Sequence, residues 1–360
     1  MKFIKKEIDI KDLVDEYKAL KNYDLIIDGI FGIGLKREIE EDLRKIFIFI
    51  NSLNKTVISI DVPSGIESDT GKIMGNAIRA SYTLTMFLPK LGLFNTPAID
   101  YVGEIVVGKL GIPDYIIDSF IDSKIYLVEK DFVSNLIRRP SRTLHKGSKG
   151  RVLIIGGSIK YTGAPILSAL SALRSGCGMV YLAIPEEIHT FYRASYPEII
   201  YIPLKSKHGF ISSENLDKIC EVMRDFNINA VALGPGIGLN EEAKSFVIEF
   251  LKRVNIPTVV DADALSYIGE ILDTLTGRDL ILTPHYGEMG RILNKSPKEI
   301  SEDRFNLGKF FVNKYKIHLI LKGPFSLLFT PENEVYINPF ADSLLATAGS
   351  GDVLTGILGG

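Results

Sequence analysis

In the stretch Arg151-Val152-Leu153-Ile154-Ile155-Gly156-Gly157-Ser158, an apolar run is followed by two glycines and a serine. An uninterrupted run of this kind predicts a strand, here Arg151–Ile155, that is buried on both faces of a parallel sheet. The amphipathic segment Pro165–Arg174 follows it and predicts a helix. A strand, a turn and a helix in this order are typical of the βα units that build α/β sheets.

The same alternation continues toward the end of the chain, where apolar runs predict strands and amphipathic segments predict helices. The predicted strands are Met179–Ile184, Ala230–Leu233, Thr258–Val260, Leu280–Leu282 and Ile317–Leu321. A hairpin of Ser326–Phe329 and Val335–Ile337 follows around Pro331-Glu332-Asn333. The predicted helices are Glu214–Met223, Glu241–Lys252 and Asp303–Lys314.

The first third of the chain has a similar pattern. Its predicted strands are Asp24–Asp28, Thr56–Asp61, Tyr82–Phe87 and Ile105–Val107, with a helix over Glu40–Ile50. The stretch Asp114–Lys124 follows Ile112-Pro113 and is expected to be a connection. We therefore predict two doubly wound α/β domains joined near residues 114–124.

Composition excludes several classes of protein. A net charge of −2 over 360 residues provides no field to attract nucleic acid or anionic lipid. Two cysteines, Cys177 and Cys220, are too few for a disulfide framework. Acidic residues from Glu7 to Asp12 interrupt the apolar run that a signal peptide needs. We expect a cytoplasmic protein without a nucleic-acid or membrane partner.

Polar and glycine-containing turns follow the predicted strands of the second domain, at the sheet edge where ligands bind in such folds. Each turn has a simple structural explanation: a tight turn at the glycines, a surface histidine at His285, helix caps at Asp261 and Asp263, or a solvated Lys322. Their occurrence together favours a catalytic cleft. The turns are Gly156–Ser158, Gly234–Gly238, Asp261–Ala264, Thr283–Glu288 and Lys322–Pro324.

The loop Thr347-Ala348-Gly349-Ser350-Gly351-Asp352 opens a predicted helix near the end of the chain. Small residues let backbone N–H groups approach an anion closely, and a helix N-terminus adds partial positive charge. An aspartate beside such an anion hole is placed to act as base for a substrate hydroxyl. The loop predicts phosphoryl transfer to an alcohol.

From about Val128 to Gly360 the chain resembles the ADP/ATP-dependent NAD(P)H-hydrate dehydratases, a branch of the ribokinase-like superfamily. The motifs that carry the resemblance are His145-Lys146-Gly147, Tyr161-Thr162-Gly163-Ala164-Pro165, Gly234-Pro235-Gly236-Ile237-Gly238, Asp261-Ala262-Asp263-Ala264, Thr283-Pro284-His285-Tyr286-Gly287-Glu288-Met289, Leu321-Lys322-Gly323 and Gly349-Ser350-Gly351-Asp352-Val353-Leu354-Thr355-Gly356.

The resemblance implies repair of hydrated NADH or NADPH, with phosphorylation of the C6 hydroxyl of the nicotinamide ring followed by elimination. It implies that Asp352 is the catalytic residue, and that Ala164, Gly236, His285 and Asp352 bind the hydrated cofactor. Nucleotide binding, by ADP or ATP, is implied for Lys322, Gly323, Pro324, Phe325, Ser326 and Gly351. Glu288 is implied as an outer-shell ligand for Mg²⁺.

In the first domain, Asp28-Gly29-Ile30-Phe31-Gly32-Ile33-Gly34-Leu35 and Asp61-Val62-Pro63-Ser64-Gly65 follow neighbouring predicted strands. Taken singly, each could be a tight turn or a helix cap. The segment from about Asp24 to Pro113 resembles the later part of the NAD(P)H-hydrate epimerases, which have a Rossmann-like fold. The resemblance implies K⁺ ligands at Asp28 and Ser64, and substrate contacts at Gly32, Ile33, Gly34, Leu35, Lys36, Arg37, Glu38 and Asp61.

The sequence therefore predicts a partial Rossmann-like epimerase domain at residues 1–118, followed by a ribokinase-like doubly wound dehydratase domain at residues 124–360. The resemblance further implies that an asparagine- and glycine-rich epimerase motif would precede Met1, and that helices of the dehydratase domain would follow Gly360. We expect a homo-oligomer. Two alternatives stay open: a kinase of a small alcohol or vitamin precursor, and a fragment that only binds ligand.

Overall fold

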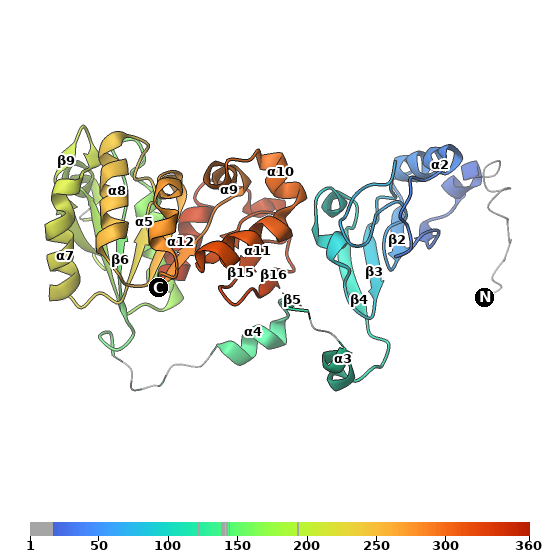
Figure 1. Cartoon of the computed structure of the whole chain (residues 1–360), viewed down its shortest axis with the longest axis horizontal. Helices are drawn as coiled ribbons and strands as arrows, with labels where there is room; N and C mark the ends of the chain where they lie inside the picture. Colours follow the sequence, from blue (N-terminus) through green and yellow to red (C-terminus); the bar gives the residue numbers. More distant parts are fainter. Residues whose placement is uncertain (1–16, 121–122, 138–140, 142, 144, 193) are drawn as a thin grey trace. The chain divides into compact units, whose positions relative to one another are not determined.

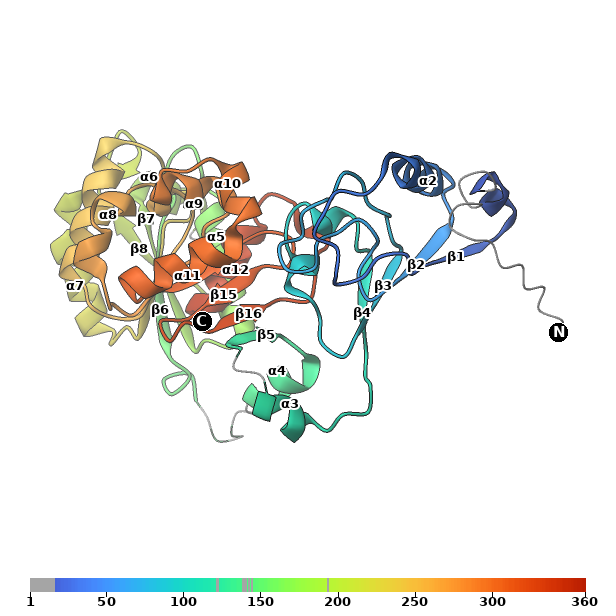
Figure 2. The ribbon, with the colours of Figure 1, turned by 45° about the vertical axis from the view of Figure 1, so that its right-hand side comes forward.

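The computed structural model describes residues 17–120, 123–137, 141, 143, 145–192 and 194–360. The chain divides into two compact units, Met1–Asp122 and Ser123–Gly360 (Figures 1 and 2). The residues that argued against a signal peptide lie in 1–16, outside the described residues. No helix of the described chain combines the length and the apolar character that crossing a membrane would require.

The first unit contains a four-stranded parallel sheet. Its strands follow one another in chain order: β1 (Leu25–Asp28), β2 (Thr56–Ile60), β3 (Tyr82–Met86) and β4 (Glu104–Gly108). Helix α2 (Glu41–Ser52) connects β1 to β2 and buries Ile46, Phe47 and Ile50 in a core with Ile26 and Val57. The first unit also contains short 3-10 helices: η1 (Tyr17–Asn22), η2 (Leu91–Phe94) and η3 (Ala98–Asp100).

One prediction for this region is wrong, and the expected connection contains a helix. The described strands of the first unit run in sequential order, so their sheet is wound in one direction and has no reversal point. The expected connection contains helix α3 (Asp114–Phe120), whose first turn is built on Pro113. Pro113 directly precedes this helix, and its carbonyl accepts from the N–H groups of Ile116 and Ile117; the boundary between the two units, after Asp122, lies inside the predicted connection.

The second unit is built on a ten-stranded sheet with the order β5-β16-β15-β14-β13-β12-β11-β6-β7-β8. Strands β14 to β8 in that order are parallel, whereas β15 is antiparallel to both of its neighbours. The bounds are β5 (Ile125–Leu127), β6 (Arg151–Ile155), β7 (Met179–Pro185), β8 (Ile200–Leu204), β11 (Ala230–Leu233), β12 (Thr258–Val260), β13 (Leu280–Leu282), β14 (His318–Leu321), β15 (Leu327–Phe329) and β16 (Val335–Ile337).

Helices surround this sheet, as Figure 1 shows. They are α4 (Lys130–Leu136), α5 (Ala164–Ser175), α6 (Glu186–Tyr192), α7 (Leu216–Asp225), α8 (Glu241–Arg253), α9 (Tyr286–Leu293), α10 (Pro297–Glu302), α11 (Arg304–Tyr315) and α12 (Ser350–Gly359). Short 3-10 helices are η4 (Ser213–Asn215), η5 (Ala262–Ser266), η6 (Ile268–Glu270), η7 (Leu272–Leu275) and η8 (Ser343–Leu345). A small separate hairpin pairs β9 (Ser206–Lys207) with β10 (Phe210–Ile211).

The order of the strands reverses between β6 and β11. From β6 the chain passes to β7 and β8 on one side, and from β11 to β12, β13 and β14 on the other. This is the doubly wound arrangement predicted for the second domain. The reversal brings the turns after β6 and β11 together, and Gly157 N–H donates to the Pro235 carbonyl at 2.8 Å. Such a reversal point is where parallel α/β sheets bind ligands.

Candidate active site

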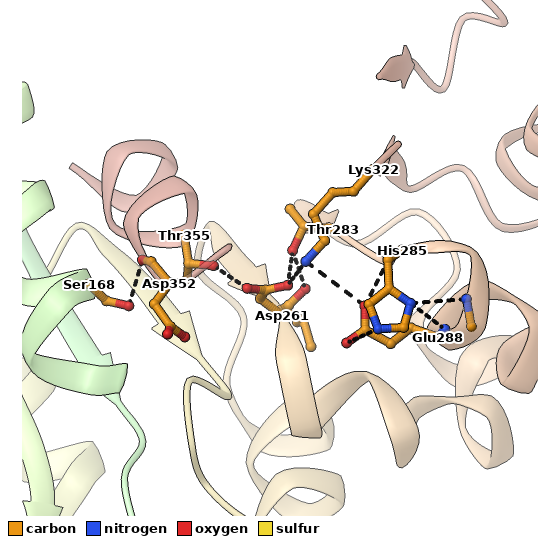
Figure 3. Close-up of polar contacts among 10 residues, drawn as sticks. Ser168, Asp261, Thr283, His285, Glu288, Lys322, Asp352 and Thr355 are labelled. Atoms are coloured by element: carbon orange, nitrogen blue, oxygen red, sulfur yellow. Dashed lines mark hydrogen bonds and ion pairs between the residues drawn. The ribbon is translucent and has the colours of Figure 1, made fainter. Parts of the chain in front are cut away.

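The carboxylate of Asp261 lies at the centre of a polar cluster in the second unit (Figure 3). Asp261 directly follows β12 and is 1% exposed. Its Oδ1 accepts hydrogen bonds from Thr283 Oγ1 at 2.6 Å and from Lys322 Nζ at 2.8 Å. Its Oδ2 accepts from Thr355 Oγ1 at 2.6 Å. One buried carboxylate thus joins the carboxyl ends of β12, β13 and β14 to helix α12.

Helix α12 places Asp352 beside this cluster. Gly349 precedes the helix with φ of 91°, a left-handed conformation that favours glycine. Ser168 Oγ on α5 donates to the Asp352 carbonyl at 2.8 Å, which ties the helix start to α5. Within the described residues, no hydrogen bond or ion pair ends on the Asp352 carboxylate. The first turn of a helix also leaves backbone N–H groups without intrahelical partners.

The pKa of Asp352 is raised to about 6. Burial is the largest cause, because it disfavours the charged form, and the nearby Asp261 carboxylate raises the pKa further. The Lys322 ammonium acts in the opposite direction. A carboxylate with a pKa near 6 is ionised at neutral pH but accepts a proton more readily than an ordinary aspartate, which suits a general base.

Lys322 links the cluster to helix α9. Its Nζ lies 3.9 Å from Glu288 Oε2, and its backbone N–H donates to the Pro284 carbonyl at 2.8 Å. Glu288 Oε2 in turn accepts from the His285 backbone N–H at 2.8 Å. His285 caps α9, because its Nδ1 accepts from the N–H groups of Gly287 and Glu288. The imidazole is exposed, and its other nitrogen, Nε2, lies 3.5 Å from Glu288 Oε1.

The predicted substrate residues Ala164 and Gly236 lie together. A Cβ placed on Gly236, whose φ is 64°, would lie 3.2 Å from the Ala164 Cβ and 2.8 Å from the Tyr161 carbonyl oxygen. The Asp263 carboxylate holds the same turn by accepting from Gly238 N–H at 2.9 Å, and burial raises the pKa of Asp263. The turn after β11 thus meets the N-terminus of α5.

The predicted nucleotide residues Lys322–Ser326 form the loop between β14 and β15. A Cβ on Gly351 would lie 3.5 Å from Lys322 Nζ, so this loop and the start of α12 are adjacent. The Phe325 side chain is only 6% exposed, so the loop offers its backbone and Lys322 to a ligand rather than the phenyl ring. Ser326 Oγ donates back to the Gly323 carbonyl at 2.9 Å.

The sequence interpretation missed three groups that the fold brings to this site. Thr283 and Thr355 bind the Asp261 carboxylate, and Arg304 donates to the carbonyls of Pro324 and Phe325. Thr283 and Thr355 lie inside the motifs Thr283–Met289 and Gly349–Gly356, and the position of Thr283 directly after a strand is a signal that could identify it. Arg304 lies in a predicted helix without any motif around it, and no local signal identifies it.

In the first unit, the predicted cation ligands Asp28 and Ser64 contact each other. Asp28 is 4% exposed, and its Oδ1 accepts from Ser64 Oγ at 2.5 Å. Its Oδ2 accepts from Ser59 Oγ and from Ser64 N–H, both at 2.8 Å. The carboxyl end of β1 and the turn after β2 are therefore joined by one buried carboxylate.

Asp61, the predicted substrate residue after β2, lies in a second cluster. Its φ is 69°, and its Oδ1 accepts from Met86 N–H at 3.0 Å and pairs with the Lys90 ammonium. Lys90 was not predicted, because it lies in a stretch without a motif.

The residues that follow β1 line a groove of about 430 Å³. They are Ile30, Phe31, Gly32, Gly34, Leu35, Lys36 and Arg37. Ile33 is exposed, and Glu38 pairs with Arg44.

The donor sets can be compared with the cations that the sequence implied. Among the described residues, no group of three or more His, Cys, Asp and Glu side chains could hold a metal ion. Glu288 is a single carboxylate whose Oε2 lies 3.9 Å from Lys322 Nζ. One carboxylate suits Mg²⁺, which keeps most of its waters. The Asp28 and Ser64 oxygens are hard ligands of the kind that K⁺ takes, although they are hydrogen-bonded to each other.

Comparison with known proteins finds two families and close relatives. A family model described as NAD(P)H-hydrate dehydratase matches residues 152–360, and one described as YjeF-related protein N-terminus matches residues 3–92. The bifunctional NAD(P)H-hydrate repair enzyme of Dictyoglomus turgidum is 60% identical over 357 residues, which is 99% of this chain and 70% of that protein.

Two solved structures are similar to about two thirds of this chain. The ADP/ATP-dependent NAD(P)H-hydrate dehydratase from Bacillus subtilis, co-crystallised with ATP and Mg²⁺, is 25% identical with a TM-score of 0.54; the match covers 65% of this chain and 80% of that one. A ribokinase-like superfamily protein from Enterococcus faecalis is 22% identical with a TM-score of 0.57, over 67% of this chain and 80% of that one. This last match concerns the fold alone.

Proposed function

The chain belongs to the bifunctional NAD(P)H-hydrate repair enzymes, and on that premise we propose how its residues carry out the repair. The enzyme returns hydrated NADH and NADPH to the reduced cofactors. Its second unit is the nucleotide-dependent dehydratase, a lyase, and its first unit is the epimerase, an isomerase that interconverts the R and S hydrates. We assign residues 1–118 to the epimerase domain and residues 124–360 to the dehydratase domain.

Asp352 is the general base of the dehydratase. Its carboxylate takes the proton of the C6 hydroxyl as that oxygen forms a bond to the terminal phosphorus of ATP or ADP and the shortened nucleotide leaves. The phosphate ester then departs from C6 with its bonding electrons, and loss of a proton from C5 restores the ring double bond. The observation that carries this assignment is a partly buried carboxylate with a pKa of about 6, raised first by burial, at the N-terminus of α12.

The nucleotide binds between the loop Lys322–Ser326 and the start of α12. N–H groups of the Gly349–Gly351 segment stabilise the charge on the transferred phosphoryl group, and Lys322 adds a positive charge at the same place. Glu288 is the side chain that would orient the waters of Mg²⁺, which would neutralise charge on the phosphates when bound. The adjacency of Lys322 and Gly351 supports this placement.

The hydrated cofactor binds at the reversal point of the sheet, against Ala164 and Gly236. The imidazole of His285 contacts it through Nε2, since Nδ1 is occupied in capping α9. Glu288, whose Oε1 lies 3.5 Å from Nε2, orients the ring. In the epimerase, Asp28 and Ser64 bind K⁺, while Asp61 and residues 32–38 contact the substrate. The groove lined by Gly32, Gly34 and Leu35 supports that assignment.

One assay tests the dehydratase proposal. The chain is incubated with S-hydrated NADH and Mg²⁺, with ATP, with ADP or without nucleotide, and the absorbance of the reduced cofactor is followed. We expect the absorbance to return only with nucleotide, and Asp352→Asn to slow this return by about 10²–10⁴-fold. A phosphorylated product that accumulates without elimination would instead identify a kinase of an alcohol, and no reaction with any nucleotide would contradict the proposal.

A second assay tests the epimerase. With pure R hydrate and nucleotide, the wild-type chain should restore the absorbance completely, whereas Asp61→Asn should leave the R hydrate unconverted and still process the S hydrate.

A further inference from the structure

Arg304 has the largest fully buried side chain of the described residues, with 0% exposure. It begins helix α11, which packs on β14 and β15. Its guanidinium donates to the Tyr286 hydroxyl at 2.8 Å, to the Pro324 carbonyl at 2.7 Å and to the Phe325 carbonyl at 2.6 Å. In the part of the chain that the structure describes, it forms no ion pair.

A buried guanidinium without a carboxylate partner is costly, because its hydration is replaced only by neutral acceptors. Burial accordingly lowers the pKa of Arg304 below its ordinary value. A buried methionine or leucine would fill the same volume without that cost. We therefore relate the buried charge to its three hydrogen-bond acceptors. Two of these acceptors are the carbonyls of consecutive residues in one loop.

That loop needs support. Phe325 has φ of 48°, the left-handed region that a residue with a side chain occupies at a cost in free energy. The planar fork of an arginine can hold two adjacent carbonyls at once, whereas the single ammonium of a lysine has no such fixed geometry. Arg304 thus holds the backbone of Pro324-Phe325 in a conformation that the loop would otherwise leave.

The third acceptor extends this support to the other side of the site. Tyr286 is the first residue of α9, next to the capping residue His285. Its hydroxyl lies 2.5 Å from where a Cβ on Gly323 would be, so the phenol packs directly on the loop backbone. One guanidinium therefore connects the loop Lys322–Ser326 with the helix that carries His285 and Glu288.

We propose that Arg304 is a positioning residue for nucleotide binding, which through Tyr286, Pro324 and Phe325 holds the loop Lys322–Ser326 against helix α9. This inference rests on the proposed nucleotide site. It predicts that loss of Arg304 weakens the binding of ATP or ADP more than the binding of the hydrated cofactor. Arg304 itself touches neither ligand.

The test uses the whole chain with Arg304→Met, Arg304→Lys and Tyr286→Phe, and Phe250→Leu as a control in the core of α8. KM for ATP and KM for the hydrated cofactor are measured separately, with the thermal midpoint of each variant. We expect Arg304→Met and Arg304→Lys to raise KM for ATP by about tenfold or more, with KM for the hydrate within about twofold. Phe250→Leu should lower the thermal midpoint and leave both KM values unchanged.

Tyr286→Phe removes a single hydrogen bond and keeps the protein measurable if Arg304→Met does not fold; it should raise KM for ATP by a few-fold. Wild-type KM for ATP in Arg304→Lys would overturn the role of the two-pronged geometry, and wild-type KM in all three variants would overturn the inference. If the wild-type chain itself does not use nucleotide, the proposed function fails and the inference fails with it. A working wild type with unaffected variants contradicts the inference alone.

Discussion

At the scale of single residues, the dehydratase site depends on two carboxylates in different surroundings. Asp261 is buried and fully engaged by Thr283, Thr355 and Lys322, so its role is to hold other groups in place. Asp352 is partly buried, and its pKa is raised to about 6 by burial and by the charge of Asp261. The difference in hydrogen bonding leaves Asp352 as the carboxylate that can exchange a proton with substrate.

Replacement of Asp352 by asparagine should separate catalysis from stability. We expect kcat to fall by about 10²–10⁴-fold. Because the folded pKa of about 6 lies above the ordinary 3.8, the folded protein retains a proton that the unfolded chain has lost, and stability falls as pH rises through that window. At pH above about 7, Asp352→Asn should therefore have a thermal midpoint equal to or above wild type, an advantage that disappears near pH 4. A lower midpoint for the variant at neutral pH would contradict this account of stability.

In the wild type, kcat/KM should decline below about pH 6 as Asp352 takes up a proton.

Replacement of Lys322 by methionine should be destabilising. It leaves Asp261, 1% exposed, with two hydroxyl donors and no cation, and breaking a buried ion pair costs about 3 kcal/mol. The free energy of unfolding in urea measures this change. Lys298→Met removes an exposed lysine from α10 and should have little effect, so equal values for the two variants would show that the buried pair contributes nothing.

At the scale of elements, helix α12 depends on two glycines for different reasons. Gly349 has a φ of 91°, and a Cβ there would lie 2.7 Å from Leu167 Cδ1. Gly351 is inside the helix, where a Cβ would make ordinary contacts, at 3.5 Å from Lys322 Nζ and 3.8 Å from Asp261 Oδ2. The first glycine is required by the backbone, and the second keeps space open beside Lys322.

The two alanine variants should therefore behave differently. Gly349→Ala should lose about 1–2 kcal/mol of unfolding free energy, because the left-handed backbone is strained with a side chain. Gly351→Ala should fold as well as wild type or gain up to about 1 kcal/mol, because alanine favours helix. Its KM for ATP should nevertheless rise about tenfold, since the methyl group occupies the approach of the phosphates. Urea unfolding and steady-state kinetics measure both effects, and an unchanged KM in Gly351→Ala would place the phosphates elsewhere.

Local pattern predicts elements well where a strand is buried on both faces. Strands β6, β11, β12 and β13 have the predicted bounds, because uninterrupted apolar runs between turns have few alternatives. Strands β5 and β8, at the two edges of the large sheet, were not predicted. An edge strand has a neighbour on one side only, and Ile125–Leu127 becomes a strand because it pairs with β16, more than 200 residues later.

At the scale of the whole molecule, the two units bury their β-sheets to different extents. In the second unit, the interior strands of the sheet are buried along most of their length. In the first unit, one sheet face packs on α2, while the opposite face leaves Leu25, Ile27, Tyr82 and Val106 between 42% and 66% exposed. Apolar surface of this kind lowers the stability that a unit gains on folding.

We therefore expect two unfolding transitions in calorimetry. ATP with Mg²⁺ should raise the transition of the second unit alone, because a ligand stabilises the unit that binds it. Asp28→Ala is the complementary variant, since it leaves the buried groups of Ser59 and Ser64 without their acceptor, and it should lower the transition of the first unit alone. A single transition that moves with both changes would mean that the two units unfold together.

The sequence by itself determined the chemistry and the class of fold. Apolar runs indicated the strands, and the turns that follow them contain Asp28, Asp61, Asp261 and His285, while Asp352 lies in the first turn of α12. The carboxyl ends of parallel strands lie at one edge of a sheet, where ligands bind. Only the tertiary structure decided which of these groups touch, since partners such as Asp261 and Thr355 are separated by 94 positions in the chain. It likewise decided the buried place of Arg304 and the pairing of Lys90 with Asp61. The pKa of Asp352 is raised mainly by burial. Segments that are distant in the sequence bury this side chain together, so no local pattern of residues predicts its pKa.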